Sequence, residues 1–154
     1  MKLILNIKPA VKTQAAEIEA VARNCLDGDE KLNDYGNDKI ITLIRSSLLT
    51  SVVVCDKVVR AFCVCESSPI PDSCEITGIY VTDGFRGIGL GRKLLSYALR
   101  EARGMRYKNA FLWVNSNNKR ADKFFRKIGF EPDGKRRLID PDTDTYELRY
   151  RIDI

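Results

Sequence analysis

The sequence contains no histidine among its 154 residues, and this absence removes several kinds of chemistry. Zinc sites built on imidazole ligands, Ser-His-Asp and Cys-His nucleophile systems, and a histidine general base all need that side chain. None of these chemistries is open to this chain.

Cysteine is present, but not in a pattern typical of metal or redox sites. The five cysteines are an odd number without a Cys-x-x-Cys pair, and they are Cys25, Cys55, Cys63, Cys65 and Cys74. The spacing Cys63-x-Cys65 would need distant partners to hold a metal. We therefore expect reduced cysteines packed as small apolar side chains, and no metal site.

Long apolar runs are also missing, since no run approaches the ~18 residues that a membrane span needs. The apolar start of the chain turns polar at Asn6 and Lys8, too soon for a signal peptide. With 44% apolar and 31% charged residues, the composition is that of a globular protein. We expect one domain over residues 1–154, cytoplasmic and without a membrane partner.

Positive charge is in modest excess, with 26 lysines and arginines against 21 aspartates and glutamates and a formal net charge of +5. Such an excess suits a polyanionic partner, which could be a nucleic acid, a phosphate-bearing cofactor or an acidic surface. The charge alone does not choose among them.

Apolar spacing predicts the order β-α-α-β-β-β-α-β-α-β-β, which is an α/β fold. The predicted elements are a strand at Leu3–Ile7, a helix at Val11–Leu26, a loop at Asp27–Asp38, a helix at Lys39–Leu49, strands at Ser51–Cys55, Val58–Cys65 and Cys74–Val81, a helix ending at Gly104, a strand at Ala110–Val114, a helix capped by Asn117 or Asn118 and ending at Gly129, and strands at Phe130–Arg137 and Thr143–Ile152. The helix before Gly104 has a predicted buried stripe of Leu90, Leu94, Leu95, Ala98, Leu99 and Ala102.

A glycine-rich loop lies between a predicted strand and that helix, and it reads Arg86-Gly87-Ile88-Gly89-Leu90-Gly91-Arg92. Alternating glycines let backbone N–H groups point into one concavity, and the helix N-terminus adds positive potential there. The spacing fits neither a Walker A loop nor the dinucleotide G-x-G-x-x-G fingerprint. A phosphate cradle is the favoured interpretation, and a tight turn that lets strand and helix pack closely is the alternative.

The motif Arg86-x-x-Gly89-x-Gly91 resembles the acyl-CoA pyrophosphate motif of the GNAT N-acetyltransferase superfamily. The resemblance extends from Glu75 to Phe130: Ile79-Tyr80-Val81 precedes the loop as that family's fourth strand does, and Asn118-x-x-Ala121 with Phe124 to Phe130 resembles a later segment. It implies a mixed, mostly antiparallel central sheet with helices on both faces. It also implies an acetyl-CoA-dependent N-acetyltransferase.

The same resemblance implies a cofactor site for acetyl-CoA. The backbone of Ile79, Tyr80 and Val81 would bind the pantetheine arm like an added strand. The loop would hold the pyrophosphate, Asn118 would lie near the pantetheine or adenosine, and Phe125 near the sulfur. The loop residues are Arg86, Gly87, Ile88, Gly89, Leu90, Gly91 and Arg92. Each residue also has an ordinary structural interpretation, such as a strand residue, a helix cap or a core aromatic.

Two positions depart from the family pattern. Phe125 stands where many relatives offer a tyrosine as general acid to the leaving thiolate, and Trp113 stands where one branch has a glutamate base. Glu75, eleven residues before Arg86, is the remaining candidate base, and simple strand alternation would place it on one face with Thr77, Ile79 and Val81. An exposed glutamate without a role, or deprotonation through water, are the alternatives. The backbone N–H near Val81 is the expected oxyanion donor.

Three functions follow from these observations. The first is direct acetyl transfer in a ternary complex to a primary amine of a small molecule or peptide, since no histidine is present to activate a cysteine. The second is a catalytically silent acyl-CoA-binding sensor, because Phe125 cannot donate a proton. The third, a nucleic-acid-binding module, is disfavoured because the basic residues form no stripe. The acceptor would be selected by residues 27–49 and the final hairpin, and a homodimer is left open.

Overall fold

The strands of this protein form one seven-stranded sheet in the order β1-β2-β3-β4-β5-β7-β6 in a computed structural model that describes residues 4–154. The strands are β1 Leu5–Pro9, β2 Leu49–Cys55, β3 Val58–Ser67, β4 Ser73–Val81, β5 Asn109–Asn115, β6 Glu131–Asp140 and β7 Thr145–Asp153. The helices are η1 Lys12–Gln14, α1 Ala15–Leu26, η2 Glu30–Tyr35, α2 Asn37–Ser46, α3 Leu90–Gly104 and α4 Lys119–Ile128. The predicted element order is confirmed, although Leu3 of the predicted first strand lies outside the described residues.

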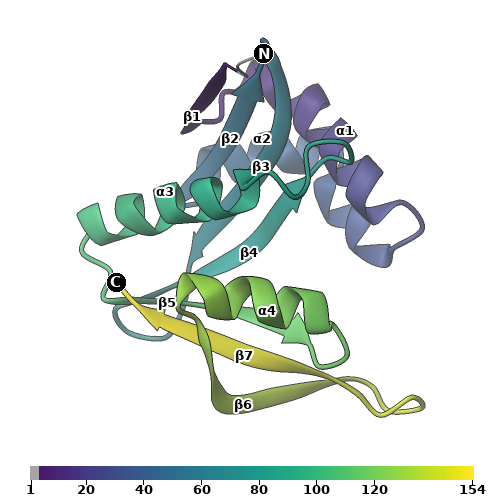
Figure 1. Ribbon diagram of the computed structural model, residues 1–154, viewed down its shortest axis with the longest axis vertical. Helices are drawn as coiled ribbons and strands as arrows, with labels where there is room; N and C mark the ends of the chain where they lie inside the picture. The colour runs from purple at the N-terminus through teal and green to yellow at the C-terminus, as the bar shows by residue number, and fades with distance from the viewer. Residues whose placement is uncertain (1–3) are drawn as a thin grey trace.

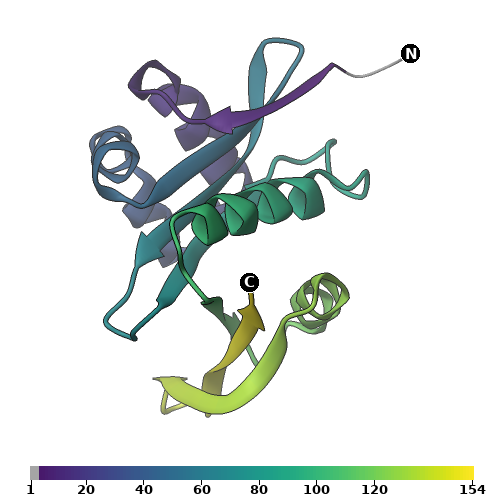
Figure 2. The same cartoon turned by 90° about the vertical axis from the view of Figure 1, so that its left-hand side faces the viewer.

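Helices cover both faces of the sheet, as the family resemblance implied (Figures 1 and 2). α3 and α4 pack on one face, in a core with residues of β2 to β5 and β7. α1 and α2 pack on the other face, against β2 and β3. Every strand pair is antiparallel except β4 with β5, so the prediction of a mixed, mostly antiparallel sheet is confirmed.

The long helix α3 buries the side that its sequence predicted. Its buried residues are Leu90, Leu94, Leu95, Ala98, Leu99 and Ala102. Their i, i+4 and i+3 spacing forms one apolar stripe toward the sheet, and basic and other polar residues lie elsewhere on the helix. Burial of this stripe holds α3 across the sheet, and the helix N-terminus is thereby placed at the end of β4.

Residues 27–49 differ from the prediction. The segment expected to be a loop contains the 3-10 helix η2, and α2 begins at Asn37 and ends at Ser46, so Leu49 belongs to β2. Buried Tyr35 at the end of η2 packs its ring on Phe62 of β3. A tertiary contact therefore orders this polar segment, and local sequence pattern could not reveal it.

The hairpin between β2 and β3 turns through Asp56 and Lys57, both with positive φ (50° and 69°). Two successive residues of positive φ are typical of a type I′ turn, so the predicted two-residue connection is confirmed. Among the cysteines, Cys55, Cys63, Cys65 and Cys74 are buried and unpaired, as expected, whereas Cys25 is only half-buried.

The sheet forks between β4 and β5. These two strands pair in parallel through only three residue pairs, from Ser73–Asn109 to Glu75–Phe111. Beyond Glu75 the strands diverge, and within residues 4–154 no strand pairs with the rest of β4 on that side (Figure 1). The fork leaves the edge of β4 open inside the molecule.

None of the helices within residues 4–154 is both long and apolar enough to span a bilayer.

The N-terminus of α4 provides a test of local stability. The Asn118 side chain accepts a hydrogen bond from the Ala121 N–H at 3.0 Å. Asn118→Ala should lower the free energy of unfolding by about 1 kcal/mol, because this N–H loses its acceptor. Asn118→Asp should keep the cap and most of the stability, and urea denaturation of both variants measures the difference. Equal stability of the Ala variant and the wild type would contradict the capping role.

Candidate functional site

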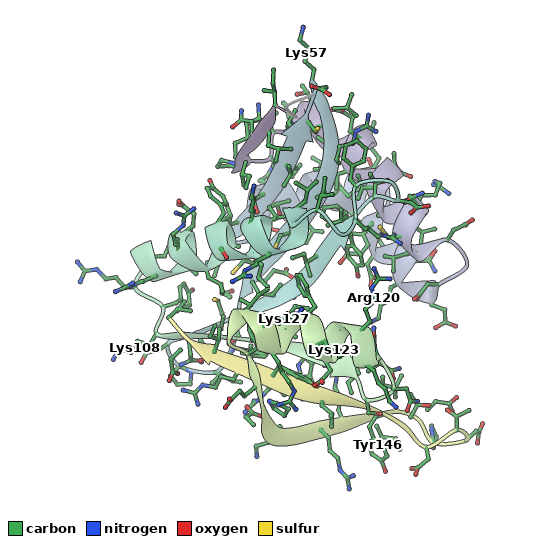
Figure 3. All side chains as sticks on the ribbon, in the orientation of Figure 1. Lys57, Lys108, Arg120, Lys123, Lys127 and Tyr146 are labelled. Carbon is green, nitrogen blue, oxygen red and sulfur yellow. The ribbon has the colours of Figure 1, made fainter. Side chains whose placement is uncertain are left out.

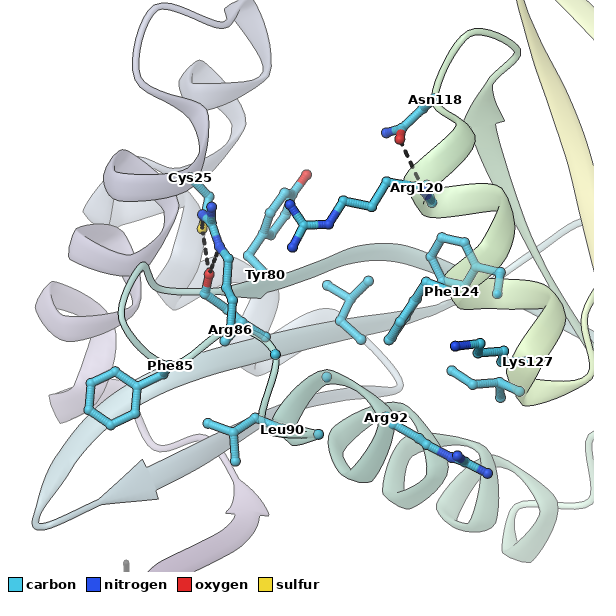
Figure 4. A pocket seen from close by; sticks show the side chains of 18 residues that line it. Cys25, Tyr80, Phe85, Arg86, Leu90, Arg92, Asn118, Arg120, Phe124 and Lys127 are labelled. Carbon is cyan, nitrogen blue, oxygen red and sulfur yellow. Dashed lines mark hydrogen bonds between the residues drawn. The ribbon is translucent and has the colours of Figure 1, made fainter.

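A cavity of ≈ 600 Å³ opens where β4 and β5 diverge (Figure 4). It is bounded by the end of β4, the glycine loop with the first turn of α3, and one side of α4. Its lining residues are Cys25, Ile79, Tyr80, Val81, Phe85, Arg86, Gly87, Gly89, Leu90, Gly91, Arg92, Asn118, Arg120, Ala121, Phe124, Phe125, Lys127 and Ile128.

One wall of the cavity is the open edge of β4. The Thr82 N–H donates to the Arg60 carbonyl on β3. Bonded and non-bonded pairs alternate along an antiparallel ladder, so the backbone groups of Tyr80 also face β3 and those of Ile79 and Val81 face the cavity. This edge can pair with an extended ligand that carries amides.

The Val81 carbonyl at the end of this edge already has two partners. It accepts hydrogen bonds from Arg86 Nε at 2.9 Å and from Cys25 Sγ at 3.2 Å. Arg86 also approaches the Cys25 sulfur at 3.4 Å through a second guanidinium nitrogen. The Arg86 side chain thus ties the glycine loop to β4 and α1, while the Ile79 backbone groups and the Val81 N–H remain open to a ligand.

The glycine loop forms the second wall. Gly87 and Gly89 adopt positive φ (78° and 87°), a conformation that side chains rarely tolerate, and Gly89 is the N-cap of α3. No side chain caps this helix and no acidic residue lies in its first turn. The first amides of α3 therefore point outward without partners from the helix, which makes an anion-binding site at the end of a helix whose dipole also favours negative charge.

The charge of the cavity has one sign. Four cationic side chains line it, namely Arg86, Arg92, Arg120 and Lys127, and no aspartate or glutamate is among the lining residues of the described chain. Arg120 and Lys127 lie along the side of α4 that faces α3 and β4 (Figure 3). A ligand that fits this cavity is a polyanion with an extended, amide-bearing portion.

The structure brings most of the residues predicted for the cofactor to this one cavity. Two predicted site residues are not in its lining: Ile88, whose side chain is exposed, and Glu75. Asn118 lies at the cavity and also caps α4. Phe125 is buried and packs edge-to-face on Phe124 and Phe130, so its ring is also a core residue.

Sequence reasoning missed several lining residues. Arg120, Phe124 and Lys127 are spaced i, i+4 and i+7 from one another, so the helical period could have predicted that they share one side of α4. Phe85 and Cys25 carry no such signal. Cys25 comes from α1, far away in the sequence, and only the tertiary structure places its thiol at the end of β4.

Glu75 lies on the face of the sheet opposite to Ile79 and Val81, although strand alternation predicted that all three share one face. The β3–β4 register shifts between Cys65–Ile76 and Val64–Gly78, which is a bulge at Thr77. The bulge turns Ile79 and Val81 to the α3 face, together with Ile76. The prediction that Glu75 shares a face with Ile79 and Val81 is therefore wrong, because strand alternation does not continue through a bulge.

Glu75 instead faces other charged side chains at the last pair before the fork. It stands directly opposite Glu66 on β3 and makes no hydrogen bond or ion pair with the residues from 4 to 154. Burial raises the pKa of the Glu75 carboxyl, Arg137 partly offsets the rise, and Glu66 and Glu147 add to it. A half-buried carboxyl with a raised pKa is suited to accept a proton near neutral pH.

Comparisons with known proteins agree with this architecture. A family model described as the acetyltransferase (GNAT) family matches residues 16–130. An uncharacterized N-acetyltransferase of Methanocaldococcus jannaschii is 39% identical over 57 residues, which are 37% of this chain and 25% of that protein. The uncharacterized N-acetyltransferase YjgM of Escherichia coli is 35% identical over 60 residues, 39% of this chain and 36% of that protein. The matched segments thus span well under half of the curated relatives' length.

The fold also resembles solved structures over nearly the whole chain. The structure of the PaiA N-acetyltransferase from Thermoplasma acidophilum in complex with coenzyme A superimposes with a TM-score of 0.79 at 16% identity, and the match covers 97% of this chain and 99% of that one. At this identity the likeness establishes the fold alone. Since the family model covers most of the chain and the forked sheet agrees with it, the protein belongs to the acetyltransferase (GNAT) family.

Proposed function

We propose that this protein is an acetyl-CoA-dependent N-acetyltransferase, which moves an acetyl group to a primary amine by direct transfer in a ternary complex. The observation that carries the proposal is the cavity at the fork, where an open strand edge, a helix N-terminus and four cations meet and where residues 4–154 contribute no carboxylate to the lining. The coenzyme A in the PaiA structure supports the choice of cofactor. The acceptor would be an amine-bearing small molecule or peptide. That residues 1–154 form a single domain and that the protein is cytoplasmic both stay predictions.

In this proposal each wall of the cavity would bind a different part of acetyl-CoA. The amides from Gly87 to Arg92, Ile88 included, would hold the pyrophosphate, and the cations would offset the phosphate charges. The pantetheine arm would pair with Ile79 and Val81 along the edge of β4. Asn118 would lie beside the arm or the adenosine, and Phe125 beside the sulfur.

The acceptor amine needs to lose a proton before it attacks. An amine with a pKa of ~10.4 costs roughly 4–5 kcal/mol to deprotonate at neutral pH. Because α3, α4 and the cofactor would occupy one face of the fork, we infer that the amine arrives from the opposite face, where Glu75 can act as the base. An open backbone N–H of β4 near Val81, that of Ile79 on the side toward the fork, would then stabilise the oxyanion. Deprotonation through water is the alternative.

A covalent route through cysteine is disfavoured, although the Cys25 thiol does line the cavity. Its Sγ donates to the Val81 carbonyl, and without histidine no neighbouring base is available to take the thiol proton. Direct attack of the amine on the thioester needs no acyl-enzyme.

The cradle can be tested at Gly89. A Cβ built on Gly89 meets no atom within 4 Å, and φ is positive there, so Gly89→Glu and Gly89→Gln carry the same backbone strain and differ in charge. We expect the Glu variant to bind acetyl-CoA at least about tenfold more weakly than the Gln variant, because its carboxylate repels the pyrophosphate. Isothermal calorimetry on both folded proteins measures this ratio. Equal affinities would remove the cradle from the proposal.

The base can be tested with Glu75→Gln. If Glu75 takes the amine proton, kcat should fall roughly 10²–10⁴-fold at neutral pH, acetyl-CoA affinity should stay the same, and the loss should shrink as pH rises. An unchanged kcat and pH profile on an acetylated amine would favour the water route.

The same Glu75→Gln variant should gain stability at neutral pH. A raised carboxyl pKa means that the fold favours the protonated form, so ionisation of Glu75 destabilises the protein as pH rises through that pKa. The gain should disappear below about pH 4, where the wild-type carboxyl is protonated in both states. Melting curves from pH 4 to 8 measure this crossover, and a variant less stable than the wild type at every pH would contradict it.

Direct transfer and the sensor alternative are separated by turnover. Acetyl-CoA at one hundred times its Kd should raise the free energy of unfolding by about 2.7 kcal/mol, because it binds only the folded protein, and Tm should rise accordingly. With a panel of polyamine, aminoglycoside, amino-acid and peptide amines, CoA should be released without a stoichiometric acetyl adduct on any cysteine in intact-mass spectra. Binding without CoA release across the panel would favour the sensor, and a stoichiometric adduct would overturn direct transfer.

A further inference from the structure

Two tyrosine side chains converge on Gly78 at the fork. A Cβ built on Gly78 would lie against the Tyr35 hydroxyl, and 3.1 Å from Cε2 of the Tyr80 ring. Tyr80 therefore leans back along β4, from the end near the cradle toward the bulge at Thr77. The absence of a side chain at Gly78 is what lets both phenols reach this point.

Packing holds both rings in place. Tyr35, Phe62 and Tyr80 form a cluster with ring centroids 5.4–5.5 Å apart, mostly edge-to-face. The Tyr35 hydroxyl donates to the Thr77 carbonyl at 3.4 Å, which connects η2 to the bulge. Two phenols fixed in this way are preorganised at the open end of the β4–β5 pairing.

The two tyrosines face different cavities. Tyr80 lines the cofactor cavity, and Tyr35 lines a second cavity of ≈ 510 Å³ between α2, η2 and the strands β3 and β4. Within the described chain, Tyr80 is the one residue of the cofactor-cavity lining that carries a hydroxyl group. Phe125, at the position from which many relatives donate a proton, has none.

In the proposed binding mode the sulfur of the cofactor would lie near this point. The pyrophosphate would lie at the cradle, just after Val81, and the arm would run back along β4 toward the fork. The arm would run along the stretch of β4 from Val81 to Ile76, which spans five residues or about 17 Å of extended strand. Tyr80 rises from β4 on the side away from α3 and leans in the same direction as the arm would run (Figure 4).

We infer that Tyr80 is a catalytic residue whose hydroxyl donates to the sulfur as coenzyme A leaves, and that Tyr35 is the residue that positions it. This inference rests on the proposed acetyltransferase function.

The bonds and protons of the transfer step balance without another reactant. The amine nitrogen bonds to the acetyl carbon, the C–S bond breaks, and the sulfur keeps the electron pair and takes the Tyr80 proton. The attacking nitrogen carries a positive charge and one excess proton once the C–N bond has formed. It gives this proton to the phenol oxygen, directly or through Tyr35, as it becomes the neutral amide nitrogen. Tyr80 is restored after each turnover.

The surroundings keep both phenols protonated. Burial raises the pKa of Tyr35 and of Tyr80. The neighbouring Tyr80 hydroxyl adds to the rise at Tyr35, whereas the Tyr35 hydroxyl partly offsets the rise in the pKa of Tyr80. The charged or titratable groups that act on the pair are Cys25, Asp29, Asp34 and Glu66, and each of them also raises one or both values. A phenol that does not ionise near neutral pH can pass a proton on at every working pH.

The test removes only the hydroxyl, with Tyr80→Phe. We expect kcat to fall about 10- to 100-fold, the worth of a hydrogen bond to a charged atom, with little change in KM for acetyl-CoA. The second measurement is binding of CoA and of desulfo-CoA, which lacks the sulfur, at about pH 9.5, where a free thiol is mostly ionised. The wild type should prefer CoA, and Tyr80→Phe should lose that preference about tenfold while keeping its affinity for desulfo-CoA.

Two control variants accompany it. Tyr97→Phe, on α3 away from both cavities, should match the wild type in both measurements. Tyr35→Phe should lower kcat less than Tyr80→Phe and weaken the preference for CoA in part.

An equal preference for CoA in the wild type and Tyr80→Phe, or an equal loss of affinity for both ligands, would overturn the role of Tyr80. A wild type that binds neither ligand would instead refute the proposed cofactor, so the two failures are distinguishable.

Discussion

The short pairing between β4 and β5 is the constraint on which the site depends. Three residue pairs join the two halves of the sheet, and beyond them the edge of β4 runs inside the molecule with backbone groups that face a cavity. An unpaired buried N–H or C=O costs on the order of 1–3 kcal/mol, so such an edge calls for a partner from outside the fold. The first amides of α3 impose the same demand beside it. A ligand with both amides and phosphates satisfies the two demands at once.

Small residues let the parts around the fork approach one another. A Cβ at Gly91 would lie 3.2 Å from the Phe124 ring, so α3 and α4 meet closely at the base of the cavity. Gly78 does the same on the other face, where it admits two phenols. The bulge at Thr77 then decides which β4 side chains reach which face, with Ile79 and Val81 toward α3 and Glu75 on the opposite side.

The sheet separates charges of opposite sign at the fork. On the cofactor side the described residues line the cavity with four cations and no carboxylate, whereas on the other face Glu66 and Glu75 stand directly opposite each other. Like charges across a ladder destabilise a sheet, and no ion pair within residues 4–154 relieves Glu75. Under the proposed function this arrangement matches the reactants, since the donor is a polyanion and the acceptor arrives as a cation.

Local patterns in the sequence determined the element order, the buried stripe of α3, the glycine loop before it and an asparagine cap for α4, which the structure assigns to Asn118 and not to Asn117. Each of these depends on residues within a few positions of one another, so periodicity and turn chemistry suffice. The Cys25 thiol on the Val81 carbonyl and the meeting of Tyr35 with the Thr77 carbonyl depend on contacts between segments 42 to 56 residues apart. The bulge at Thr77 depends on how β4 pairs with β3. Only tertiary packing decides these, because a register shift or a long-range contact is selected by the neighbouring elements and leaves no signal in the local sequence.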